Sequence, residues 1–208
     1  MGDGRKLRGE ATRERILESA RELFGERGYE GTSIELVLEA SGVARGAVYH
    51  HFASKAELFD AVAERVFVEI SERTGAAVAA AGGDTMDRFR AGARAWLQMA
   101  LDPAVQRIAL IDALTVLGWR RWRALDEDHS LGTLRARFAQ MEAEGRVPEG
   151  QSELLANLLL AALNEAALYI ASAEDQPAAL ETATATIDQI LTRFAEAPGR
   201  GRPAAAQA

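Results

Sequence analysis

The sequence predicts an all-α protein with an N-terminal three-helix unit and a larger C-terminal helical bundle. Ala, Leu, Glu and Arg, which favour helices, dominate the 208 residues, and no stretch alternates β-branched with polar residues as a strand would. Apolar residues instead recur every three or four positions, between breaks that contain Gly, Pro or Asp. These two patterns leave helices as the only regular structure that we expect.

The first helix is predicted by an apolar and an acidic stripe that precede residue 28. Its apolar residues are Ile16, Leu17, Ala20, Leu23 and Phe24. An acidic residue stands at every fourth position of the same segment: Glu14, Glu18, Glu22 and Glu26. This spacing puts the carboxylates on one solvated face of an amphipathic helix.

A short second helix is predicted after residue 32. Thr32 and Glu35 fit a capping box, so the helix should begin near Ile34. Ser41-Gly42 should end it, because glycine suits the left-handed conformation that such a turn needs.

A third helix of about two turns is predicted over residues 44–51. Ala47 and Val48 can face inward, which leaves the polar residues for the other side. Ser54 and Glu57 fit another capping box and should open the next helix at once.

Two short helices joined by a glycine turn, the second of them polar and exposed, are typical of a helix-turn-helix that binds DNA. Arg45 is the candidate for reading a base edge, since arginine bidentate to guanine is the commonest specific contact. Tyr49 and His50 are placed for phosphate or thymine-methyl contacts. Residues at helix starts are suited to hold phosphates. The candidate DNA-binding residues are Thr32, Ser33, Ala44, Arg45, Gly46, Tyr49, His50 and Lys55. The alternative is a solvated surface without a partner.

His50 and His51 are not expected to bind zinc. Neighbouring residues of a helix point about 100° apart, and no Cys or further clustered His completes a site. His51 stands beside Phe52 and is expected to pack in the small core rather than to touch DNA.

Residues 12–59 resemble the DNA-binding domain of the TetR (tetracycline-repressor) family of bacterial regulators. The resemblance rests on the first-helix pattern together with Arg27-Gly28-Tyr29, Thr32-Ser33, Ser41-Gly42-Val43, Gly46-x-x-Tyr49-x-His51-Phe52 and Ser54-Lys55-x-x-Leu58. One departure is Ala44, where the family usually has a Ser or Thr cap. Alanine caps less well by about 0.5–2 kcal/mol, so we expect this helix start to fray without DNA.

Composition excludes several classes of protein. Without cysteine the chain has neither disulfides nor thiolate metal sites. No apolar run of about 18 residues suggests a membrane span, and the N-terminus lacks an apolar signal segment. We therefore expect a cytoplasmic protein without a cofactor. The net charge of −7 is unusual for DNA binding. However, basic residues gather near the N-terminus: Arg5, Lys6, Arg8, Arg13 and Arg15.

The rest of the chain is expected to form the C-terminal bundle. The expected helices cover residues 55–79, about 85–100, from 103 onward with breaks at Gly118 and Gly132, 152–173, and a last helix to about 194. Pro103 after Asp102 takes the favoured first position of a helix. The expected domains are a flexible basic arm (1–9), the helix-turn-helix domain (10–55), an effector-binding and dimerisation domain (56–197) and a disordered tail (198–208).

Three tryptophans, and polar residues inside apolar runs, predict an effector pocket in this bundle. The candidate residues are Phe67, Trp96, Met99, Asp112, Trp119, Trp122, Asn164, Glu165 and Tyr169. Helix bundles bind ligands between their helices, and a buried carboxylate needs a partner, water or a ligand. Ordinary core packing is the alternative for the tryptophans. For the carboxylates, the alternative is a salt bridge to Arg107, Arg120, Arg121 or Arg123.

The predicted helix 152–173 is apolar nearly all round, so it should be buried on more than one side. The simplest arrangement packs one side on the core and another on a second copy, and deep burial within a monomer is the alternative. The resemblance implies dimerisation through the last two helices in a four-helix arrangement. The candidate interface residues are Leu155, Leu159, Ala162, Leu163, Ala166, Ile187, Leu191 and Phe194.

Motif and resemblance together predict a homodimeric, ligand-responsive transcriptional regulator, most simply a repressor. It would bind a palindromic operator in double-stranded DNA and be released by a small, largely apolar effector. The alternative is the same DNA-binding regulator controlled by a protein partner or acting without a small-molecule effector. An enzyme is not expected, because no nucleophile elbow, phosphate loop, metal set or paired catalytic residues are visible in the sequence.

Overall fold

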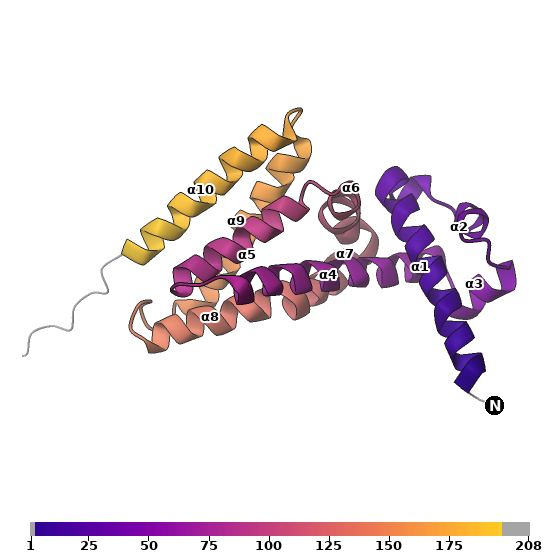
Figure 1. Cartoon of the computed structure of the whole chain (residues 1–208), viewed down its shortest axis with the longest axis horizontal. Helices are drawn as coiled ribbons and strands as arrows, with labels where there is room; N and C mark the ends of the chain where they lie inside the picture. Colours follow the sequence, from indigo (N-terminus) through magenta and orange to yellow (C-terminus); the bar gives the residue numbers. More distant parts are fainter. Residues whose placement is uncertain (1–2, 197–208) are drawn as a thin grey trace, which may run out of the picture. The chain divides into compact units, whose positions relative to one another are not determined.

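The computed structural model describes residues 3–196, with side chains from residue 7 to 193, and all of its regular elements in this range are helices (Figure 1). The prediction of an all-α fold is confirmed. The chain divides into two compact units, one of residues up to 70 together with 99–125, the other of 71–98 and the residues from 126 on. Residues 56–70 and 99–125, which we expected in the C-terminal bundle, thus belong to the first unit.

The first unit begins with α1 (Asp3–Gly31), which is interrupted at Gly28 (φ 70°, ψ 175°). Residues 3–9, which we expected to form a basic N-terminal arm, extend this helix. Residues 1–2, the side chains of Arg5 and Lys6, and the expected tail 198–208 lie outside the described residues.

Three further helices complete the small N-terminal core: α2 (Ile34–Ser41), α3 (Arg45–His51) and the first part of α4 (Lys55–Ala80) (Figure 1). The core residues are fully or almost fully buried and come from all four helices: Ile16, Leu17, Ala20, Phe24, Val37, Val48, Leu58 and Phe59. Phe24 and Phe59 pack edge to face with ring centres 5.1 Å apart. The apolar stripe read from the sequence of the first helix therefore faces this core.

The first unit also contains α6 (Pro103–Val105), the π-helix η1 (Gln106–Asp112) and α7 (Ala113–Asp126), which is kinked at Gly118. The carboxylate of Asp102 caps α6 by accepting the N–H of Ala104 at 2.8 Å, with Pro103 in the expected first position. α1 packs closely on this segment, since a Cβ on Gly25 would stand 2.9 Å from that of Ala104. Glycine is needed there because the two backbones approach each other.

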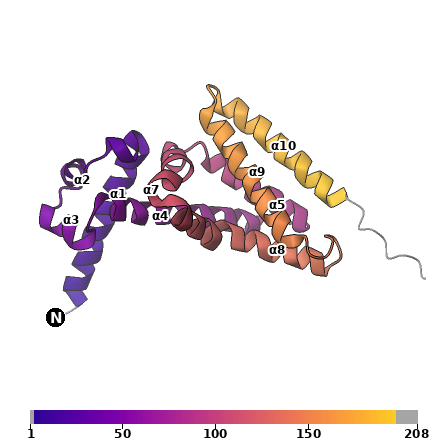
Figure 2. The ribbon, with the colours of Figure 1, turned by 180° about the vertical axis from the view of Figure 1, so that it is seen from behind.

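The second unit contains the end of α4 from Ser71 on. Its other helices are α5 (Thr85–Met99), the π-helix η2 (Glu127–Leu131), α8 (Gly132–Ala143), α9 (Ser152–Ser172) and α10 (Gln176–Glu196). α9 and α10 form an antiparallel pair (Figure 2). The loop before α9 is fixed by Glu142, whose carboxylate accepts the N–H groups of Gly150 and Ser152 at 2.8 and 3.0 Å.

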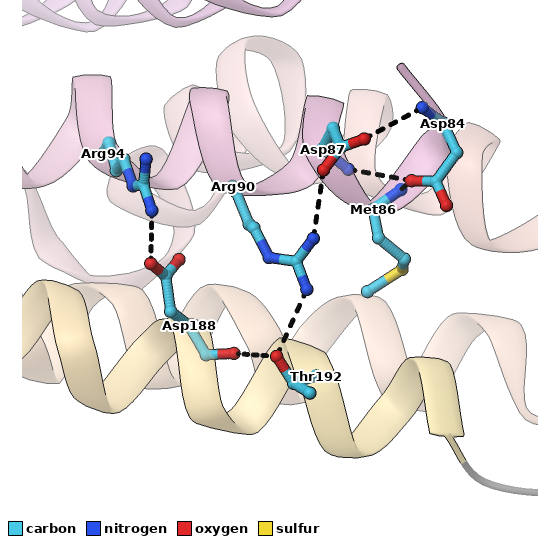
Figure 3. A network of polar contacts seen from close by, with 7 residues as sticks. All are labelled: Asp84, Met86, Asp87, Arg90, Arg94, Asp188 and Thr192. Carbon is cyan, nitrogen blue, oxygen red and sulfur yellow. Dashed lines mark hydrogen bonds and ion pairs between the residues drawn. The ribbon is translucent and has the colours of Figure 1, made fainter.

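A polar network joins α5 to α10 on one side of the second unit (Figure 3). Asp84 caps α5 by accepting the N–H of Met86 at 2.7 Å. Arg90 bridges Asp87 and Thr192 at 3.1 and 3.2 Å, and one turn further along α5 Arg94 pairs with Asp188 (Figure 3). The face of α10 that carries Asp188 and Thr192 is therefore already occupied within the protomer.

Candidate nucleic-acid interface

The turn between α2 and α3 depends on Gly42. Its φ of 61° and ψ of 25° are left-handed, and its N–H donates to the carbonyl of Leu38 at 3.0 Å. The two helices begin where the sequence predicts. Ala44 takes the N-cap position of α3 and forms no side-chain capping bond, so the start of α3 depends on its backbone alone.

Ser33, and not Thr32, caps α2. The Ser33 hydroxyl accepts the N–H of Leu36 at 3.2 Å. Thr32 is 1% exposed, and its hydroxyl lies 3.0 and 2.9 Å from the carbonyl oxygens of Leu23 and Gly28. The expectation that Thr32 caps the helix and contacts phosphate is therefore wrong, because the fold uses this hydroxyl internally.

α3 presents a polar and aromatic face to solvent. The Arg45 side chain is 66% exposed and Tyr49 is 45% exposed, and Gly46 and His50 are exposed as well. Val48 is fully buried on the inner side of the same helix. This is the arrangement that a helix needs in order to pack on its own core and still enter a DNA groove.

Arg45 has two neighbours on this surface. Its Nη2 lies 3.1 Å from Oε1 of Glu35, and its guanidinium carbon lies 5.7 Å from the ring centre of Tyr49. An exposed ion pair contributes about 0–1 kcal/mol, so Arg45 can exchange this carboxylate for a base or a phosphate. The contact with Glu35 was not predictable from the sequence, because no local spacing rule joins residues across the turn.

Lys55 contacts the residue that follows the break in α1. Its Nζ donates to the carbonyl of Tyr29 at 3.0 Å and lies 4.0 Å from the centre of the Tyr29 ring. An ammonium carries three donors, so two remain for a phosphate. Lys55 thus stabilises the chain before α2, in addition to the phosphate contact that we expect of it.

Two arginines of α1 support α2 and α3. Nη2 of Arg15 donates to the carbonyl of Ser41 at 2.6 Å, where it stabilises the carboxyl end of α2. The guanidinium carbon of Arg13 lies 5.4 Å from the ring centre of Phe52. The sequence marked both as basic residues near the N-terminus but gave no signal for these contacts.

His51 is half-buried, with its ring centre 6.3 Å from that of Phe52 and 5.3 Å from that of His50. Burial, followed by the neighbouring His50 and Arg13, lowers the pKa of His51 from its ordinary value of 6.5. The neutral imidazole is therefore favoured, in agreement with the expectation that His51 packs beside Phe52.

Asp112, a candidate effector residue, has two partners inside the first unit. Its Oδ2 accepts the backbone N–H of Tyr29 at 2.7 Å and Nε of Arg107 at 3.1 Å. The salt-bridge alternative is thus confirmed for Asp112. Phe67 and Met99 are buried in the same unit.

The three tryptophans belong to different units. Trp96 is buried in the second unit, where its indole N–H donates to the carbonyl of Leu163 at 3.2 Å. Trp119 and Trp122 lie in the first unit with ring centres 5.3 Å apart, and Trp119 is 62% exposed. Core packing is therefore confirmed for Trp96, and neither unit by itself contains the expected cluster of three.

The polar candidates of α9 do not line the interior of the second unit. Glu165 and Ala161 are exposed, Tyr169 is 52% exposed, and Asn164 is half-buried. Glu165 and Tyr169, which we expected to line an effector pocket, therefore face outward in the second unit.

Half of the candidate dimer residues are already buried within the second unit: Leu159, Leu163, Ile187 and Leu191. Three more are half-buried: Leu155, Ala162 and Ala166. The Phe194 side chain lies outside the described residues. The exposed large apolar residues of α9 are instead Leu154, Leu158, Leu168 and Tyr169. The predicted face was wrong for the four buried residues, because a helix that is apolar all round gives no periodic signal for the side it exposes.

α9 is long and apolar enough to cross a membrane, by length and composition alone, with 33% of its most apolar window buried. A core helix of a soluble protein meets the same criterion. α9 therefore has large apolar side chains that are exposed to solvent in the protomer.

The α2–turn–α3 geometry, with a left-handed glycine between the helices and an exposed Arg45 and Tyr49 on the second, defines a helix-turn-helix DNA-binding unit. Two family models match the chain. "Bacterial regulatory proteins, tetR family" covers residues 16–62, and "Tetracyclin repressor-like, C-terminal domain" covers residues 86–194. The chain belongs to the TetR family of bacterial transcriptional regulators.

Individual relatives agree with this assignment. The chain is 44% identical over 61 residues to the HTH-type transcriptional repressor AcnR of Corynebacterium efficiens, a match that covers 29% of this chain and 32% of AcnR. A TetR-family transcriptional regulator from Pectobacterium atrosepticum is 35% identical, with a TM-score of 0.75 over 90% of this chain and 96% of that one. FadR from Bacillus subtilis in complex with stearoyl-CoA is similar in fold alone, at 16% identity and a TM-score of 0.71 over 85% and 96%. All three are transcriptional regulators and none is named as an enzyme.

Proposed function

We propose that this protein is a homodimeric, ligand-responsive repressor that binds a palindromic operator in the cytoplasm. The observation that carries the proposal is the exposed face of α3 with Arg45, Tyr49 and His50, which is supported from behind by buried Val48. In a two-fold symmetric dimer, two such helices would enter successive major grooves about 34–36 Å apart.

Each residue of the interface takes a role that its surroundings permit. Arg45 leaves Glu35 and reads a guanine edge, while Tyr49 and His50 contact phosphates or a thymine methyl. Ser33 and Lys55 stand at the starts of α2 and α4, where backbone N–H groups favour a phosphate.

Ala44 and Gly46 act through their small size at the start of α3. A Cβ on Gly46 would meet no atom within 4 Å, so this position is open on the protein side. The DNA backbone could therefore approach the first turn of α3 closely.

The dimer would form through the exposed side of α9. Leu154, Leu158 and Leu168 stand there between 38% and 62% exposed. Their spacing of four and ten residues keeps them on one face of a helix with 3.6 residues per turn. Exposed leucines aligned on one face of a helix are typical of a surface that a partner covers. On α10 small exposed residues would permit close helix approach: Ala178, Thr182 and Ala185.

The effector is proposed to be a small, largely apolar molecule that binds among the helices after residue 55. FadR, which shares this fold, was seen in complex with stearoyl-CoA, whose acyl chain is apolar although its CoA part is charged, and this supports a ligand with an apolar portion. Control by a protein partner is the second candidate. Buried Trp96 offers the discriminating measurement, because a ligand bound nearby would change its fluorescence.

Arg45→Ala tests the DNA-binding role. Loss of a bidentate base contact should weaken binding by about 5- to 150-fold, the factor for 1–3 kcal/mol, in gel shifts with a duplex that the wild type selects from a random pool. Arg88→Ala, at an exposed position of α5 in the second unit, removes the same charge and should leave binding unchanged. Equal binding by Arg45→Ala and wild type would reject the assignment. Binding should also weaken steeply with salt, since phosphate contacts release counterions.

A further inference from the structure

The backbone of Tyr29 is held at both of its polar groups by charged side chains. Its N–H donates to Oδ2 of Asp112 at 2.7 Å, and its carbonyl accepts from Nζ of Lys55 at 3.0 Å. Asp112 comes from η1, and Lys55 is the first residue of α4. Since Tyr29 directly precedes the turn into α2, these two contacts fix the point at which the helix-turn-helix joins α1.

The N–H of Tyr29 needs this partner because α1 is broken just before it. Gly28 has a φ of 70°, so the chain leaves the helical path there. Backbone N–H groups that lose their helical acceptor must find another one. The Asp112 carboxylate, 11% exposed, supplies it.

Arg107 completes the contact from the other side. Its Nε donates to the same Oδ2 of Asp112 at 3.1 Å. Its guanidinium lies directly on Gly28, where a Cβ would stand 2.3 Å from Nη2. Position 28 therefore needs glycine for its positive φ, and a side chain there would also have to displace the guanidinium of Arg107.

The pairing of Arg107 with Asp112 depends on the π-helical form of η1. Five residues make about 1.4 turns of an α-helix, which would point the two side chains roughly 140° apart. A π-helix joins residues five apart by hydrogen bonds and so brings them to one face. The N–H of Ala113 indeed bonds to the carbonyl of Ile108, five residues back. A change of η1 to α-helix would therefore separate Arg107 from Asp112.

The segment around η1 is tied to α1 at other points, so that it and α1 act as one support. Nη2 of Arg21 lies 3.1 Å from both Asp102, which caps α6, and Glu69 of α4. Gly25 packs on Ala104.

We infer that Asp112 is a positioning residue for operator binding, and that the π-helical register of η1 sets this position. This inference rests on the proposed DNA-binding function. An effector that converts η1 to α-helix would withdraw Asp112 from Tyr29 and release the helix-turn-helix from its support, which lowers operator affinity. The regulated element is then the Gly28–Tyr29 turn.

The first test is the amide exchange of Tyr29. The chain has three tyrosines, so ¹⁵N-tyrosine labelling of the full-length protein gives three amide signals, with Tyr49 and Tyr169 as internal references. Asp112→Ala should speed exchange of the Tyr29 amide by at least about tenfold, since its acceptor is lost, and leave the other two unchanged. Unchanged Tyr29 exchange would overturn the inference.

The second test is operator affinity, measured by fluorescence anisotropy with the duplex that the wild type selects. Asp112→Ala should weaken binding by about tenfold, and Asp112→Asn, which keeps an acceptor for Tyr29, should recover part of the loss. The matched control is Asp60→Asn, which removes an ion pair with Arg121 (2.7 Å) in the same unit without touching the turn. Asp60→Asn should bind the duplex within twofold of wild type even if its melting temperature falls as much as that of Asp112→Ala. Equal losses in Asp60→Asn and Asp112→Ala would overturn the positioning role.

The register is tested by a double-mutant cycle. Arg107→Gln and Asp112→Asn should be non-additive in Tyr29 exchange, because the two side chains face each other only in the π form. Additive effects would overturn the role of the π register. If the wild-type protein selects no duplex from the random pool, the proposed DNA-binding function is rejected. If the wild type binds its duplex and Asp112→Ala binds it equally well, only the positioning role of Asp112 is rejected.

Discussion

An ion pair with both side chains in solvent joins Glu35 of α2 to Arg45 of α3, with 3.1 Å between Oε1 and Nη2. The arginine that we assign to base reading is therefore engaged with a carboxylate when DNA is absent. Operator binding has to replace that carboxylate, and it brings the negative charge of Glu35 close to the phosphates.

Glu35→Gln should increase operator affinity by about two- to fivefold, in line with up to 1 kcal/mol for an exposed ion pair. The measurement is fluorescence anisotropy at low and at physiological salt. Glu39→Gln is the control, since Glu39 is an exposed carboxylate on the same helix. If both variants gain equally, general charge and not the contact with Arg45 explains the effect.

Ala44→Ser should stabilise the start of α3. Ala44 forms no side-chain cap, and a serine hydroxyl could accept a free N–H of the first turn. The gain expected from capping is about 0.5–2 kcal/mol, seen as slower amide exchange at Gly46 and a higher free energy of unfolding. Ala40→Ser, inside α2 and exposed, should give no such gain.

Acid should destabilise the protein partly through His51. The folded state lowers the pKa of His51 below 6.5, so the unfolded chain takes up the proton more readily. Stability should therefore fall as the pH drops through about 6.5 toward the lower pKa of the folded protein. Urea titrations at several pH values between 7.5 and 5.5 measure this, and His51→Gln should show a shallower decline over that interval. Parallel curves for the two proteins would assign the loss to other groups.

Leu158→Asp should dissociate the dimer. Leu158 is 52% exposed on α9, so the charge is tolerated in a monomer but would be buried unpaired between two copies. Sedimentation velocity should give a mass near one chain of 22.4 kDa for the variant and twice that for the wild type. Ala136→Asp, exposed on α8, should remain a dimer. A dimeric Leu158→Asp would remove this side of α9 from the proposed interface.

Elements with local signals were predictable from the sequence. The left-handed Gly42, the cap at Ser54 (3.1 Å to the N–H of Glu57) and the Pro103 helix start all follow from residues within four positions of each other. The family resemblance depends on the same short-range pattern. Thr32 and Ser33 were not distinguishable in this way, because both hydroxyls fit a cap and only the structure shows that the Thr32 hydroxyl is buried against the carbonyls of Leu23 and Gly28.

Contacts that depend on tertiary structure were not predictable. Neither the Glu35–Arg45 pair nor the bond from the Tyr29 N–H to Asp112 has a sequence spacing that predicts it, although Arg107 was among the expected partners of Asp112. The π-helical form of η1 differs from an α-helix by one hydrogen-bond step, and neighbouring elements decide between them. On α9, an apolar residue at nearly every position removes the periodicity that would have distinguished Leu158 from Leu159.

The two hydrogen bonds to the backbone of residue 29, from its N–H to Asp112 and from Lys55 to its carbonyl, determine which substitutions a saturation library would retain. Both bonds go to the peptide groups and not to the phenol, so phenylalanine should be accepted at position 29, whereas proline, which lacks the donor, should be depleted. At position 28 the positive φ should favour glycine over every other residue, and any side chain would also have to displace the guanidinium of Arg107.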